Sequence, residues 1–130
     1  GRWKEMAGYE IALSVAEKYK TKILLAHMGG VFPELVKQTV DSIKAQSIKN
    51  AYLVTSGMSS SRDSVMLEQC PPEIVAYAIH GVGADKILLG SDFPFGKQED
   101  MIKSVFRSGV SPKDLEKILW RNATEILHLS

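Results

Sequence analysis

The chain has little cysteine, no dominant sign of charge and no long apolar run, and each shortage excludes a class of protein. Cys70 is the single cysteine among 130 residues, which rules out an internal disulfide framework and a zinc site built from several cysteines. No apolar run approaches the roughly 18 residues that a membrane-spanning helix needs. Sixteen Lys and Arg against fifteen Asp and Glu leave a formal net charge of +1, so charge alone attracts neither nucleic acid nor an anionic membrane.

Several common catalytic motifs are also missing. Gly29 and Gly30 precede an expected helix, but neither a G-x-G-x-x-G pattern nor the spacing of a Walker lysine accompanies them. Ser91 lacks the G-x-S-x-G setting, and the neighbouring Asp92 cannot orient a histidine base from the adjacent position. The sequence therefore does not favour a serine hydrolase, while a phosphate held by backbone N–H groups at the Gly29-Gly30 turn stays open as a weaker alternative.

The rest of the composition is typical of an ordinary globular protein. Hydrophobic residues make up 45% of the chain and charged residues 24%, and no interdomain linker or repeat interrupts it. We expect one domain over residues 1–130, with Cys70 chemically inert. Because the first residues lack the apolar core of a secretory signal, we expect a soluble, cytoplasmic protein.

Short apolar strands alternate with helices along the chain. We expect strands at 22–26, 51–55 and 86–89. We expect helices at 4–19, 33–43, 72–79, 100–107, from 112 onward and at 122–127. Ser111 is the expected N-cap of one C-terminal helix and Asn122 of the last. This alternation predicts an α/β fold with βαβ units and a parallel sheet.

Polar side chains follow each of the three expected strands. His27 comes after the first, Thr55 and Ser56 end the second, and Ser91 and Asp92 follow the third. Ligands of parallel α/β folds gather at the carboxyl ends of strands, so these residues would share one rim. Each also has a purely structural interpretation, because His27 can pack over a turn, Asp92 can form an Asx-turn, and the hydroxyls can cap a strand end.

The functional interpretation pairs His27 with Asp92. Imidazole and carboxylate are common ligands of zinc, and either can relay a proton to a metal-bound water. A catalytic zinc usually has three protein ligands, and His80, near a helix end, and His128, near the C-terminus, are poor candidates for the third. Two ligands alone do not complete a site.

Four sequence blocks carry a family resemblance. The blocks are AHMGGVFPE at 26–34, NAYLVTSG at 50–57, GADKILLGSDFPF at 83–95 and SPKDLEKILWRNATEIL at 111–127. Together they resemble the amidohydrolase-related (amidohydrolase 2) TIM-barrel metal-dependent hydrolases, a family that includes aminocarboxymuconate-semialdehyde and resorcylate-type decarboxylases. The resemblance implies a partial (β/α)8 barrel, corresponding to about strands six to eight in its C-terminal half.

The resemblance also implies roles for individual residues. His27 would act in acid/base or substrate-polarising chemistry and could bind metal, while Asp92 would bind metal and accept a proton from the attacking water. Gly29, Gly30 and Ser91 would shape the site. The implied cofactor is a divalent metal, zinc or else manganese, and the implied reaction on a small-molecule substrate is hydrolysis of a C–N or C–O bond or a decarboxylation.

The family pattern is incomplete in this chain. The resemblance requires a His-x-His pair on the first barrel strand and a histidine after the fifth, and neither is present. A complete barrel takes about 250 residues. We therefore expect weak or absent metal binding, no useful catalysis by the chain alone, and either self-association or association with the missing N-terminal half. The alternative is a non-catalytic half-barrel or interaction module.

Overall fold

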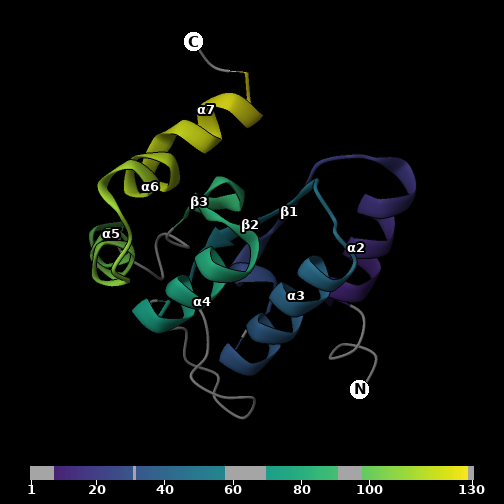
Figure 1. Ribbon diagram of the computed structural model, residues 1–130, viewed down its shortest axis with the longest axis horizontal. Helices are drawn as coiled ribbons and strands as arrows, with labels where there is room; N and C mark the ends of the chain where they lie inside the picture. Colours follow the sequence, from purple (N-terminus) through teal and green to yellow (C-terminus); the bar gives the residue numbers. More distant parts are fainter. Residues whose placement is uncertain (1–7, 31, 58–69, 91–97, 129–130) are drawn as a thin grey trace.

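The computed structural model describes residues 8–30, 32–57, 70–90 and 98–128 and shows helices alternating with short strands (Figure 1). The strands are β1 (Ile23–Leu25), β2 (Ala51–Thr55) and β3 (Ile87–Leu89). The longer helices are α2 (Gly8–Tyr19), α3 (Pro33–Ala45), α4 (Pro72–Val82) and α5 (Gln98–Arg107). The shorter helical segments are η1 (Ala26–Gly29), η2 (Ala84–Lys86), α6 (Pro112–Glu116), η3 (Lys117–Arg121) and α7 (Asn122–Ile126). Each expected strand is confirmed, although β1 and β3 are shorter than expected.

The strands form a parallel sheet in the order β1-β2-β3, as the alternation predicts. Leu53 on the central strand aligns with Leu25 on one side and Ile87 on the other. Because partners in register point to the same face, these three buried side chains form one apolar row across the sheet. The parallel arrangement also brings the carboxyl ends of all three strands to one edge.

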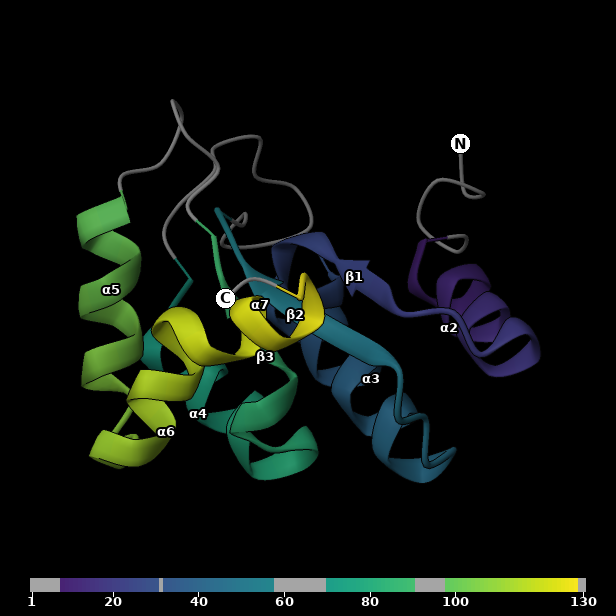
Figure 2. The ribbon, with the colours of Figure 1, turned by 90° about the horizontal axis from the view of Figure 1, so that it is seen from above.

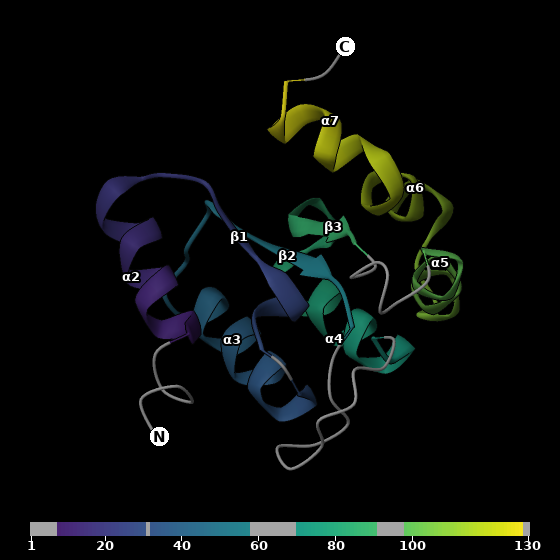
Figure 3. The same ribbon diagram turned by 180° about the vertical axis from the view of Figure 1, so that it is seen from behind.

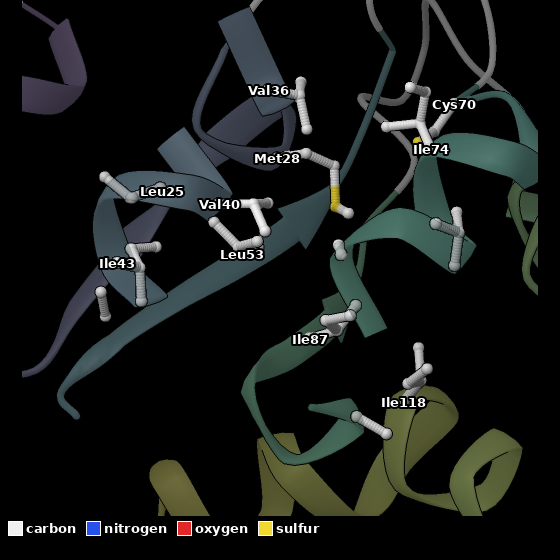
Figure 4. Close-up of a cluster of buried hydrophobic side chains, with 14 of the residues drawn as sticks. Leu25, Met28, Val36, Val40, Ile43, Leu53, Cys70, Ile74, Ile87 and Ile118 are labelled. Atoms are coloured by element: carbon white, nitrogen blue, oxygen red, sulfur yellow. The ribbon is translucent and has the colours of Figure 1, made fainter. Parts of the chain in front are cut away.

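The hydrophobic core lies between that row and the helices α3 and α4. Figures 1 and 3, taken from opposite sides, show both helices on the same face of the sheet. The helices begin with Pro33 and Pro72. Proline suits the first helical turn because N–H groups there have no partner within the helix, so the missing N–H loses no hydrogen bond. Figure 4 shows Val36 and Val40 of α3 close to Met28 and Leu53, and all four are completely buried.

The other face of the sheet is less well covered. Leu24 aligns with Tyr52 on this face and is 48% exposed, and β1 has a neighbour on one side alone among the described strands. Helix α2 lies beyond β1, with α5, α6 and α7 toward the β3 end (Figure 2). On α2, Ile11 and Tyr19 are 60% and 63% exposed. Exposed apolar side chains therefore lie both on β1 and on α2, the helix that contacts it.

The C-terminal helical region corrects one sequence prediction. Ser111 caps α6 as expected, its Oγ accepting the Asp114 N–H at 3.2 Å. Asn122 does not cap a helix, since α6, the π-helical η3 and α7 follow one another and the residue preceding α7 is helical. Instead, its buried Nδ2 donates to the carbonyls of Ala84 and Ile87 at 2.7 and 2.8 Å. Asn122 thus ties the C-terminal helices to β3.

No helix among the described ranges is both long and apolar enough to cross a bilayer. Buried Cys70 fits its expected inertness, because burial and, to a lesser degree, the charge of Glu73 raise the pKa of its thiol from 9.0 to about 12. Gly83 ends α4 with φ of 91°, whereas Gly81 lies within the helix. The first part of the helix expected at 4–19 lies outside the described residues.

Candidate functional site

The chain makes a left-handed turn at the carboxyl end of β1. His27 has φ 53° and ψ 38°, Met28 has φ 56° and ψ 26°, and Gly29 has φ 81°. The left-handed conformation costs a residue with a Cβ about 1–2 kcal/mol. Two such residues in succession persist when their surroundings hold them in place, and such strain clusters at functional sites.

Packing on α3 holds this turn. Gly29 lies against Thr39, whose hydroxyl donates to the Gly29 carbonyl at 2.8 Å. A Cβ on Gly29 would lie 2.5 Å from Thr39 Cγ2, and one on Gly30 would lie 2.7 Å from backbone atoms of Leu35 and Val36. Both glycines therefore allow the backbone to approach α3 closely, while the part in shaping a site that the resemblance implies for them stays a prediction.

The same turn does not favour the phosphate alternative. The Gly30 N–H donates to the His27 carbonyl at 3.0 Å, so it is already used within the turn. At the start of α3, the Leu35 and Val36 N–H groups donate to the Phe32 carbonyl. These backbone donors are consequently not directed at a ligand.

His27 contacts the end of the neighbouring strand through both backbone and side chain. Its backbone N–H donates to Ser56 Oγ at 2.7 Å, and its Nδ1 lies 3.1 Å from the same oxygen. Nδ1 also hydrogen-bonds the backbone carbonyl of Gly57. Ser56 and Gly57 are buried and His27 is partly buried. The parallel sheet thus brings together His27 and Ser56, two of the residues expected at the rim.

Of the remaining rim residues, Thr55 has a structural role, and Ser91 and Asp92 lie in a part of the chain that the structure does not describe. Thr55 is completely buried, and its hydroxyl exchanges hydrogen bonds with Gly90, donating to the carbonyl at 3.1 Å and accepting from the N–H at 3.0 Å. Thr55 therefore joins the ends of β2 and β3. Ser91 and Asp92 lie outside the described residues, so the pairing of His27 with Asp92 stays a prediction.

The described residues alone do not fit a catalytic metal. Nowhere in the ranges that the structure covers do three His, Cys, Asp or Glu side chains gather as a metal would require. His80 lies in the last turn of α4 and His128 is exposed beyond α7, so neither joins His27 at the rim. Any metal site that includes His27 would need Asp92 and further ligands.

Sequence reasoning missed the left-handed turn and the partners of His27. The pair Gly29-Gly30 was interpreted as a break in the strand, although a glycine is also the usual signal of positive φ. Ser56 was expected to be an ordinary hydroxyl at a strand end. No local pattern indicates that it lies against His27, because that contact depends on the register of β1 with β2.

Comparison with known proteins shows which family the chain matches. A family model described as amidohydrolase matches residues 8–129. The chain is 29% identical over 118 residues to 2-amino-3-carboxymuconate-6-semialdehyde decarboxylase of Caenorhabditis elegans. This match covers 85% of the chain but 28% of the decarboxylase.

Solved structures give the same family and the same partial coverage. A dihydroxybenzoic acid decarboxylase from Polaromonas sp. JS666, with bound manganese and the inhibitor 2-nitroresorcinol, matches with 25% identity and a TM-score of 0.61. An amidohydrolase from Burkholderia multivorans with bound zinc matches with 15% identity and a TM-score of 0.62, which shows a shared fold. The matches cover 91% and 93% of this chain, but 37% and 50% of the two solved chains.

Proposed function

Because the chain belongs to the amidohydrolase family, we propose that it supplies the C-terminal part of the active-site rim of a metal-dependent barrel enzyme, and that the completed enzyme is a decarboxylase. The observation that carries the proposal is His27, held at the carboxyl end of β1 by the end of β2. Active sites of TIM-barrel enzymes lie on this face of the barrel.

Decarboxylation is favoured over hydrolysis by the named relatives. The Caenorhabditis elegans relative and the Polaromonas structure are both decarboxylases of unsaturated or aromatic acids. The manganese in the Polaromonas structure and the zinc in the Burkholderia structure support a divalent metal as the cofactor. The proposed substrate class is accordingly a small unsaturated or aromatic carboxylic acid.

The proposal divides the chemistry between two side chains of this chain. His27 presents an imidazole that can exchange a proton with the substrate or polarise its carboxylate. Asp92 is proposed as a metal ligand at the end of β3. The described residues do not form a complete set of ligands, and the proposal takes further ligands from the rest of the barrel.

The free edge of β1 is the proposed junction with the rest of the barrel. An unpaired strand edge presents N–H and C=O groups that a further parallel strand can bond. Leu24 on β1 is half-exposed, Ile11 and Tyr19 are exposed on α2, the helix that contacts β1, and the proposal covers these side chains with the adjoining helix and strand. The proposed partner is therefore the remainder of an amidohydrolase barrel, since the chain covers 37% of the Polaromonas enzyme.

Complementation tests this function directly. The chain would be co-expressed with the portion of the Polaromonas decarboxylase that it does not match, and the purified complex would be assayed for manganese content and for carbon dioxide released from dihydroxybenzoic acid. We expect a complex that contains manganese and releases carbon dioxide. Replacing His27 by Gln should remove most of the activity, and replacing Asp92 by Asn should reduce the manganese content.

His80→Gln is the matched control, because His80 lies on α4 away from the rim. Its complex should retain both metal and activity. A folded complex that lacks manganese, or one that keeps full activity after His27→Gln, would show that the proposed roles are wrong. A stable homodimer of the chain without metal would instead favour the alternative of a non-catalytic interaction module.

A further inference from the structure

The environment of His27 determines which of its ring nitrogens carries the proton. We propose that Ser56 and the Gly57 carbonyl hold the neutral imidazole as the Nδ1–H tautomer, so that Nε2 keeps its lone pair. Ser56 is then a positioning residue that acts through His27. This inference deepens the proposed function, on which its catalytic meaning rests, but the tautomer itself is a property of the chain alone.

The Gly57 carbonyl decides the direction of the hydrogen bond. A backbone carbonyl oxygen can accept a hydrogen bond but cannot donate one. Nδ1 hydrogen-bonds this oxygen, so Nδ1 must carry the proton. If Nδ1 were unprotonated, its lone pair would face a lone pair of the Gly57 carbonyl oxygen in a partly buried position, and the two would repel each other.

Ser56 supports the same arrangement from the other side. Its Oγ lies 2.7 Å from the His27 backbone nitrogen and therefore accepts that N–H. The same Oγ lies 3.1 Å from Nδ1, close enough to accept a share of the Nδ1–H bond as well. Ser56 is 6% exposed, so water competes little for these contacts. One serine thus fixes both the backbone turn and the ring of His27.

The left-handed turn is what makes these contacts possible. At φ 53° the His27 backbone departs from the extended conformation of β1, so its N–H and its ring can both reach the end of β2. In the described part of the chain, no residue hydrogen-bonds Nε2. A neutral imidazole fixed in this way offers Nε2 as a proton acceptor or a metal ligand.

Nitrogen-15 NMR of the chain tests the proposal. The spectrum is recorded with labelled histidine at about pH 8.5, well above the ordinary histidine pKa of about 6.5, because the protonated and unprotonated nitrogens of a neutral imidazole have distinct chemical shifts. We expect His27 to show a protonated Nδ1 and an unprotonated Nε2. Exposed His128 serves as the internal reference, because a neutral imidazole free in water prefers the opposite tautomer.

Substitutions of Ser56 test whether it positions the His27 ring, separately from any contribution to the stability of the fold. Ser56→Ala should lower the ratio of the Nδ1–H to the Nε2–H tautomer at His27 by about threefold to tenfold, as expected for the loss of one hydrogen bond. Ser56→Thr keeps an Oγ and should restore the ratio. Ser108→Ala, the same chemical change at the end of α5, should leave the ratio unchanged.

The outcomes are distinct from those of the complementation experiment. A wild-type His27 that shows mainly Nε2–H would overturn the proposal, even if Ser56→Ala failed to fold. An unchanged ratio in a folded Ser56→Ala would show that Ser56 does not position the ring. The Nδ1–H tautomer in a chain that never yields a metal-containing complex would leave this inference standing and the proposed function wrong.

Discussion

Replacing Gly29 by Ala should destabilise the chain through two effects that the structure allows us to separate. The first is backbone strain, because Gly29 has φ 81° and a residue with a Cβ pays about 1–2 kcal/mol in that region. The second is overlap, because the new Cβ would lie 2.5 Å from Thr39 Cγ2. Overpacking of this kind typically costs about 1–3 kcal/mol.

Gly109 provides the matched control. Its φ is also 81°, but a Cβ built there meets no other atom within 4 Å. Gly109→Ala should therefore show the backbone effect alone, and the change in the unfolded chain is the same for both substitutions. The difference in free energy of unfolding between the two variants, measured by equilibrium urea denaturation, should be about 1–3 kcal/mol.

A double-mutant cycle identifies the overlapping atom. Thr39→Ser removes Cγ2 while keeping the Oγ that donates to the Gly29 carbonyl. In this background Gly29→Ala should cost only slightly more than Gly109→Ala, because the methyl group at 2.5 Å is gone and Thr39 Cβ, at 3.2 Å, is the nearest atom that remains. Equal costs of Gly29→Ala and Gly109→Ala in the unaltered chain would refute the reasoning, since they would show that α3 does not constrain the turn that carries His27.

Three further substitutions test the remaining structure. Asn122→Ala should lower the free energy of unfolding by about 2–3 kcal/mol, because two buried carbonyls lose their donor. A loss of only about 1 kcal/mol in urea denaturation, as is typical of a helix cap, would contradict this role. Leu53→Ala should lower the free energy of unfolding by about 2–5 kcal/mol, and Leu24→Ala, at a half-exposed position, by about 1 kcal/mol. Similar urea midpoints for the two variants would contradict the assignment of Leu53 to the buried face of the sheet and Leu24 to the other face. Cys70 keeps its proton to about pH 12 when folded but loses it near pH 9.0 when unfolded, so its contribution to the free energy of unfolding should fall as pH rises above 9.0. In urea melts, the free energy of unfolding of Cys70→Ala should therefore decline less steeply above pH 9.0 than that of the unaltered chain. An identical decline in both would show that the thiol is accessible.

The sequence predicted the sheet well because its signals are local. Each short apolar run between turn residues became a strand, and parallel pairing followed from the helices between them. Asn122 was wrongly expected to cap a helix because asparagine favours N-caps, whereas its partners, Ala84 and Ile87, lie more than thirty residues away in the chain. The partners of His27 escaped prediction for the same reason, since register between β1 and β2 sets them.

The candidate site was predictable only in part. The position of His27 at a strand end followed from periodicity, and the family resemblance implied its chemistry. Its left-handed backbone did not follow, because positive φ is uncommon for residues other than glycine and nothing in the local pattern indicates the packing on Thr39 that accompanies it. Tertiary contacts therefore determine the conformation of the site more than local propensity does.

The proposed metal site at the rim beside His27 is tested most directly by a manganese titration of the complex with the rest of the barrel, followed by NMR of the labelled chain. Manganese is paramagnetic and broadens the signals of nearby nuclei. In the complex, we expect manganese to broaden amide signals around residues 26–30 and 55–57, and we expect this broadening to weaken in Asp92→Asn but to persist in His80→Gln. Broadening that Asp92→Asn leaves unchanged, that centres on His80 or His128, or that is absent at saturating manganese would contradict the account.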